Sequence, residues 1–251
     1  QFKYAMVLTE KKNEPARMAE LHDRIALAYQ EKEDFELAVK HFSASLELNR
    51  QTGNQSSLSR ALRNIANNIY LQSRLQPDSE KMSRALNYYF DAIDKLEKYG
   101  VADRKKKSSA LLEVNIEAGI GDDVSGAAYG FDKSGEQKII FHYIGKIYGD
   151  FGDNQKAIEY FQKKLKLIPK ELDVEKNIPV LLEKALLLNQ LGRFYFQSGE
   201  TRKSLEYFKD SFELSRKLDN RNGMAVNAAN LARAVLTMSV RDNIGSEAEE
   251  V

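Results

Sequence analysis

The side chains best suited to chemistry are scattered along this chain rather than grouped. Its three histidines, His22, His41 and His142, have no metal-ligand spacing with one another, and the chain has no cysteine to provide thiolate ligands or disulfides. The motifs HExxH, GxSxG and CxxC do not occur. We therefore expect no metal, no cofactor and no catalytic centre within these residues, and we predict that the chain is not an enzyme.

The remaining weak motifs fall in a glycine-rich segment, residues 119–135. The pair Asp122-Asp123 has no partner base nearby, and residues 132–135 lack the alternating ligands of a calcium loop. The glycines between 119 and 126 follow a predicted helix rather than a strand, and no Gly-Lys-Ser/Thr ending follows them, so a phosphate loop is not indicated. We interpret the segment as a surface insertion. The alternative is a loop that folds over a binding groove.

Charge excludes two broad classes of partner. The chain has 38 Lys and Arg against 37 Asp and Glu, a net charge of +1, which gives no general attraction to nucleic acid or to an anionic membrane. The run Lys105-Lys106-Lys107 has no interleaved aromatic residues, so a solvated helix start is the better interpretation. No apolar run is long enough to cross a bilayer. We expect no nucleic-acid partner and no membrane insertion; the lack of cysteine fits the cytoplasm and the periplasm equally, so localisation stays open.

Apolar residues recur at helical spacing through most of the chain. Leu21, Ile25 and Tyr29 are one example, and Ile140, Ile144 and Tyr148 are another. Spacings of three and four residues place such side chains on one buried stripe of a helix. Alternating apolar and polar runs are scarce, and the chain has only 4 prolines. The sequence therefore predicts an almost entirely α-helical protein.

One motif recurs three times with the same internal spacing: a small residue, an aromatic residue one turn later, then a second small residue and a second aromatic. The copies are Ile25-Ala26-x2-Tyr29-x8-Ala38-x3-Phe42, Ile144-Gly145-x2-Tyr148-x8-Ala157-x3-Phe161 and Leu191-Gly192-x2-Tyr195-x8-Ser204-x3-Phe208. The small residues let two helices approach closely, and the aromatic side chains fill the space beside the crossing. Turn-forming residues lie in the middle of each copy. Each copy therefore predicts a helical hairpin.

Two partial copies extend the series. Ile65-Ala66-x2-Ile69 is followed by Ala85-x3-Tyr89, with seven extra residues inserted around Pro77. The last copy, which begins at Leu231, contains the residues of a first helix only. The distance from the first copy to the second, and from the third full copy to the last, is about 40 residues.

The motif residues resemble those of the tetratricopeptide repeat, in particular the long-repeat branch seen in signalling adaptors and bacterial regulators. The resemblance implies an all-α, right-handed superhelical solenoid of antiparallel helix pairs, formed as a single domain over residues 1–251. The expected parts are repeats at about 17–53, 57–99, 138–170 and 179–218, a degenerate repeat at 104–137, a terminal helix at 222–238 and a disordered tail at 239–251.

The resemblance also implies a concave groove lined by the first helix of each pair. The residues beside the small motif position would face it, and we expect them to bind the partner: Arg63, Asn64, Asn67, His142, Lys146, Asn189, Arg193, Asn230 and Arg233. Asparagine can bracket a peptide backbone, and arginine can clamp a carboxylate. The alternatives are that these are solvated polar positions, or that Asn64 and Asn230 cap or bridge adjacent repeats.

These expectations combine into a non-catalytic scaffold for protein–protein interaction. Lys146, Arg193 and Arg233 occupy equivalent places in three successive first helices, which predicts a protein or peptide partner with an acidic segment or a carboxy-terminal carboxylate. The alternative is a sensory or regulatory segment of a larger signalling or proteolytic enzyme. The chain begins at Gln1 rather than Met, and we expect it to be a piece of a longer protein.

Overall fold

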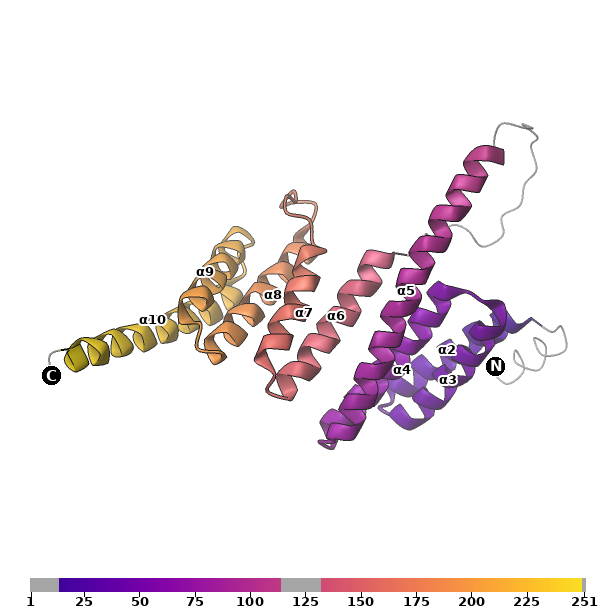
Figure 1. Cartoon of the computed structure of the whole chain (residues 1–251), viewed down its shortest axis with the longest axis horizontal. Coiled ribbons are helices and arrows are strands. Elements are labelled where there is room, and N and C mark those ends of the chain that lie inside the picture. The colour runs from indigo at the N-terminus through magenta and orange to yellow at the C-terminus, as the bar shows by residue number, and fades with distance from the viewer. Residues whose placement is uncertain (1–13, 114–131, 250–251) are drawn as a thin grey trace. The chain divides into compact units, whose positions relative to one another are not determined.

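Helices form all the regular structure in the part of the chain that the computed structural model describes, residues 14–113 and 132–249 (Figure 1). Side chains are described over 14–98 and 132–240. The helices are α2 Pro15–Glu31, α3 Phe35–Thr52, α4 Gln55–Leu75, α5 Ser79–Glu113, α6 Lys133–Asp150, α7 Asn154–Lys166, α8 Ile178–Gln197, α9 Thr201–Lys217 and α10 Arg221–Glu249. The chain divides into two compact units, residues 1–140 and 141–251, with the boundary inside α6.

In the first unit, each helix from α2 to α5 packs on the next one along the chain. The motif positions form the centre of these contacts: Ala26, Ala38 and Phe42 are fully buried between α2 and α3. Ala66 and Tyr89 are equally buried in the pair formed by α4 and α5. The small and aromatic residues therefore occupy the helix crossings that their spacing predicts.

The second unit repeats this arrangement from the last turns of α6 to α10. Gly145 of α6 lies against the ring of Phe161 of α7, and Gly192 of α8 lies against the ring of Phe208 of α9. Helix α10 packs on α9 but has no second helix of its own in the described chain, so Ala232, at the equivalent place, is exposed. Within the described residues the last copy therefore consists of one helix.

The turns inside the three full motif copies share one backbone hydrogen bond. The N–H groups of Asp34, Asp153 and Glu200 donate to the carbonyl oxygens of Tyr29, Tyr148 and Tyr195, over 3.0, 2.9 and 2.9 Å. The residue before each donor has a positive φ, 60° at Glu33, 77° at Gly152 and 80° at Gly199. This bond closes the end of the first helix and reverses the chain, which explains why the eight-residue gap is constant.

The structure differs from the sequence prediction at two segments, the start of the expected degenerate repeat at 104 and the expected disordered tail from 239. Residues 104–113 do not begin a separate degenerate repeat but continue α5, because one glycine, Gly100, does not end a helix that good helix formers surround. The rest of that expected repeat, up to 131, lies outside the described residues. The expected disordered tail is helical up to Glu249, because no proline follows Pro179 and alanine and glutamate favour the helix.

Candidate functional site

A small pocket in the second unit brings together three of the residues predicted to bind a partner. Arg193 comes from α8, and Asn230 and Arg233 come from the neighbouring helix α10. The pocket has a volume of about 80 Å³. Its other lining residues are Phe196, Gln197 and Phe208. Two aromatic rings and two amides thus line the pocket beside the two arginines.

The electrostatics of this pocket are unbalanced. Arg193 and Arg233 are both exposed, and neither forms an ion pair with any residue that the structure describes. No acidic side chain lines the pocket. The sequence also places no Asp or Glu three or four residues from either arginine, which removes the usual helical partners. The pocket therefore presents two permanent positive charges to solvent.

Lys146, the third cation of the predicted row, lies on α6 and does not line this pocket. Its ammonium nitrogen is 5.7 Å from the centre of the Tyr143 ring, a cation–π contact within its own helix. The structure thus brings two of the three cations to one pocket. The continuous row stays a prediction.

The side-chain amide of Asn189 connects α8 to α10, the first helices of two successive repeats. Its Nδ2 donates to Oδ1 of Asn227 on α10 over 2.6 Å, and Asn227 Nδ2 donates to the carbonyl oxygen of Gly223. Asn227 is 2% exposed. The pair is therefore an inter-repeat bridge, the role that the sequence analysis considered for other asparagines.

The candidates in the first unit are engaged in the structure. Arg63 Nε donates to Oε1 of Glu136 over 2.7 Å, and the two side chains are 16% and 8% exposed. Asn67 Oδ1 accepts from the Tyr89 hydroxyl. Asn64 is buried, and its carbonyl oxygen accepts from Asn68.

Asn68 is a connecting residue that the sequence analysis missed. Its Nδ2 also reaches Gln30 Oε1 on α2, over 3.0 Å. The signal for it is present, because Asn68 falls three residues after Ile65 on an otherwise apolar stripe. A polar residue on such a stripe needs hydrogen-bond partners, and Gln30 and the backbone accept from Asn68 Nδ2, whereas its Oδ1 is buried without a partner among the described residues.

His142 is half-buried and packs against Phe161 of the core of the second unit. Its ring meets Phe161 edge-on, with ring centres 5.9 Å apart, and its Nδ1 atom is buried without a hydrogen-bond partner. Burial, helped by the nearby cations Lys164 and Lys146, lowers the pKa of His142 to about 4. This histidine is therefore neutral near pH 7 and is not a cation that could attract an acidic partner.

The other residues considered for chemistry have structural roles or lie outside the described chain. His22 and His41 meet across α2 and α3 with their Nδ1 atoms 3.0 Å apart, and burial lowers the pKa of both. Asp132 caps the N-terminus of α6, since its side chain accepts a hydrogen bond from the backbone N–H of Gly135. Among the described residues no group of His, Asp and Glu could hold a metal ion. The pair Asp122-Asp123 and the glycines of residues 119–126 lie outside the described residues.

None of the described helices combines the length and apolar character that a bilayer crossing requires.

Three segments of the chain, residues 19–52, 140–171 and 185–218, match the family model described as tetratricopeptide repeat. These segments correspond to three of the full repeats that the motif spacing predicts. No match was found among the curated proteins.

Solved structures share the fold at low sequence identity. BtubC from P. vanneervenii superposes with a TM-score of 0.61 at 13% identity, covering 87% of this chain and 72% of its own. A signal-transduction ATPase with a tetratricopeptide repeat sensor, from Pyrococcus horikoshii, gives 0.58 at 16% identity, covering 93% of this chain and 30% of its own. The apo quorum sensor NprR from B. thuringiensis gives 0.54 at 16%, covering 94% and 51%. The likeness confirms the all-α array of helix pairs.

Proposed function

Because this chain is built from tetratricopeptide repeats, a fold that typically serves protein interaction, we propose that it is a non-catalytic scaffold that holds a peptide segment of its partner on α8 and α10. The preferred segment is acidic or ends in a free carboxylate. One observation carries the proposal: Arg193 and Arg233 share a pocket with Asn230, with no acidic residue among the lining.

Some exposed arginines among the described residues have an acidic partner on their own helix. Arg17, Arg24, Arg50 and Arg216 each pair with a glutamate three or four residues away. Two guanidinium groups held close together without such a partner repel each other, and a bound anion relieves that repulsion. Because Arg193 and Arg233 line one pocket that has no acidic residue, a ligand is favoured over simple solvation there.

The remaining groups of the pocket suit a peptide rather than a bare anion. The Asn230 amide offers both a donor and an acceptor, which matches the N–H and C=O of an extended backbone. Phe196 and Phe208 line the pocket and make part of its wall apolar, which suits a neighbouring side chain of the ligand. A guanidinium group can hold a carboxylate through two parallel hydrogen bonds.

A second candidate function is that of a sensor segment within a larger signalling enzyme. The superposition with the signal-transduction ATPase, which has a tetratricopeptide repeat sensor, includes 93% of this chain but only 30% of the ATPase chain. That proportion is what a regulatory module of a longer protein would show. In that case the same pocket would bind the signal, and catalysis would lie outside these residues.

The proposal is tested with short fluorescent peptides in an anisotropy titration. The set contains an acidic peptide with a free carboxy terminus, the same peptide amidated, and a neutral peptide of equal length. We expect saturable binding of the acidic peptides and loss of at least tenfold in affinity for Arg193→Glu with Arg233→Glu. The matched control is Arg202→Glu with Lys209→Glu, which makes the same change in charge on exposed positions of α9 outside the pocket. Equal affinity in both double variants would exclude the pocket.

A further inference from the structure

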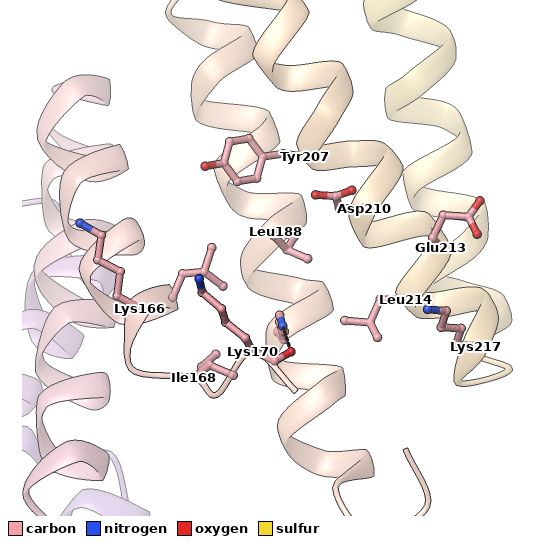
Figure 2. Close-up of a pocket in the computed structure, with 11 residues that line it drawn as sticks. Lys166, Ile168, Lys170, Leu188, Tyr207, Asp210, Glu213, Leu214 and Lys217 are labelled. Carbon is pink, nitrogen blue, oxygen red and sulfur yellow. Dashed lines mark hydrogen bonds between the residues drawn. The ribbon is translucent and has the colours of Figure 1, made fainter. Parts of the chain in front are cut away.

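The second unit has a larger hollow that shares no lining residue with the arginine pocket. It lies between α7, α8 and α9 and has a volume of about 620 Å³ (Figure 2). Helix α7 spans 13 residues and ends at Lys166, whereas α9 spans 17. The chain leaves α7 through Leu167 to Pro169, and residues at this end of α7 line the hollow together with Leu214 and Lys217 from the last turns of α9. The early end of α7 leaves the hollow open.

The lining is apolar over the area between the helices. Leu165 and Ile168 contribute from the end of α7, Leu188 from α8 and Leu214 from α9. Ile168 and Leu188 are 4% and 7% exposed, so their packing elsewhere holds them firmly in place. Four aliphatic side chains around one hollow favour a hydrocarbon chain, and the volume lies within the range of small-molecule sites, about 300–1,000 Å³.

Four lysines surround this apolar area: Lys166, Lys170, Lys184 and Lys217. None of them forms an ion pair with a residue that the structure describes. Other lysines of the same unit differ, since Lys163 pairs with Glu159 over 2.7 Å. Lys184 Nζ lies 3.5 Å from the carbonyl oxygen of Lys170, which places these two residues together at the end of α7.

The acidic residues of the hollow are on its other side. Asp210 and Glu213 come from α9, and Glu213 is already paired with Arg216 over 2.5 Å. Figure 2 shows Lys170 on the side of the α7–α8 connection and Asp210 across the hollow from it. A bound anion is therefore favoured beside Lys170 and Lys184 and disfavoured beside α9. The hollow therefore has a polarity: its charged lining at the α7–α8 connection is cationic, its middle is aliphatic, and along α9 Lys217 lies with Asp210 and Glu213.

We propose that this hollow binds a small anionic amphiphile, with its head group between Lys170 and Lys184 and its hydrocarbon chain over Leu188 and Leu214. The lysine ammonium groups act as point charges, so they accept a carboxylate or a phosphate head. The site is distinct from the arginine pocket and is independent of the peptide proposed there.

The test uses decanoate as the probe and the full chain, with binding followed by isothermal titration calorimetry. We expect one saturable site, weaker binding of decanol because it lacks the charge, and no binding of decylamine. Octanoate, two methylene groups shorter, should bind about fifteenfold more weakly, since each buried methylene contributes about fourfold in affinity. Decyl phosphate compared with decanoate then separates the two possible head groups.

Variants locate the site. Lys170→Glu with Lys184→Glu changes two lysines that are not buried and should weaken decanoate binding at least tenfold. Arg202→Glu with Lys209→Glu makes the same charge change on α9 outside the hollow and should leave binding unaltered, as should Arg193→Glu with Arg233→Glu. Three results would each overturn the proposal. They are decanoate binding without saturation, decanol binding as tightly as decanoate, and the lysine variant binding decanoate like the parent. A hollow that belongs to a peptide partner would give the first of these results.

Discussion

The ring of Phe208 lies so close to Gly192 that a Cβ atom at Gly192 would come within 2.6 Å of Phe208 Cδ1 and Cε1. Real Cβ atoms do not approach so closely, so any side chain at this position must displace the ring. At the equivalent places in the first unit, Ala26 and Ala66 are fully buried, which shows that those crossings have room for one methyl group. The crossing of α8 and α9 is therefore tighter.

Replacing Gly192 with leucine should overpack this crossing and lower the free energy of unfolding by about 1–3 kcal/mol. Urea denaturation followed by circular dichroism measures the change. The control is Ala229→Leu, which adds the same side chain at an exposed position of α10 and should stay within about 0.5 kcal/mol of the parent. If Gly192→Leu were as stable as the control, the helix register assigned to α8 would be incorrect.

A second prediction concerns the ion pair of Arg63 and Glu136. Both side chains are largely buried, so removing the arginine leaves a carboxylate that is shielded from water. We expect Arg63→Met to lower the free energy of unfolding by about 3–5 kcal/mol. The double variant Arg63→Met with Glu136→Leu should lose less than Arg63→Met alone, because no uncompensated charge remains. A thermodynamic cycle over the four proteins measures this coupling, and strictly additive losses would contradict the pairing.

A third prediction is acid destabilisation through His142. Its pKa is about 4 in the folded protein, below the ordinary value of 6.5, so the unfolded chain takes up the proton first. The stabilising contribution is therefore complete above about pH 6.5 and is lost progressively as the pH falls toward 4. The shift corresponds to roughly 3 kcal/mol.

The measurement for His142 is the free energy of unfolding at a series of pH values for the parent and His142→Leu. The parent should lose stability below about pH 6.5 more steeply than the variant, while carboxylates and the pair His22 and His41 affect both proteins alike. Parallel curves would show that His142 does not carry the effect.

The helical hairpins could be predicted because their cause is local. The fixed gap between Ala26 and Ala38 places both small residues at the crossing of the two helices, where they are buried. The turn between the helices, at Glu33, is closed by a backbone hydrogen bond. The seven residues inserted around Pro77 also have a simple outcome: α4 extends to Leu75 before the chain turns. Such features depend on neighbours in sequence, so spacing alone reveals them.

The partners of polar side chains could not be predicted in the same way. Arg63 and Glu136 are 73 residues apart, and a helical period says nothing about which distant carboxylate meets an arginine. The bridge from Asn189 to Asn227 has the same origin. The hollow beside α7 depends on the lengths of two helices, since α7 has 13 residues and α9 has 17. The motif spacing does not predict this difference. For the cations, the motif register predicts a row of Lys146, Arg193 and Arg233; Arg193 and Arg233 line one pocket, and their role in binding stays a prediction.

The last prediction concerns the salt dependence of peptide binding at Arg193 and Arg233. Both guanidinium groups are exposed, so their attraction for an acidic peptide is screened once the Debye length, about 8 Å at physiological ionic strength, approaches the charge separation. Affinity for the acidic peptide should fall several-fold between low and high salt, while the neutral peptide should change little. Arg193→Gln with Arg233→Gln should flatten this dependence, because the charges that salt screens are gone, whereas Lys170→Glu with Lys184→Glu should leave it as steep as in the parent. A salt dependence that persists in the arginine variant would place the anion-binding charges elsewhere on the protein, and the proposed site would have to be abandoned.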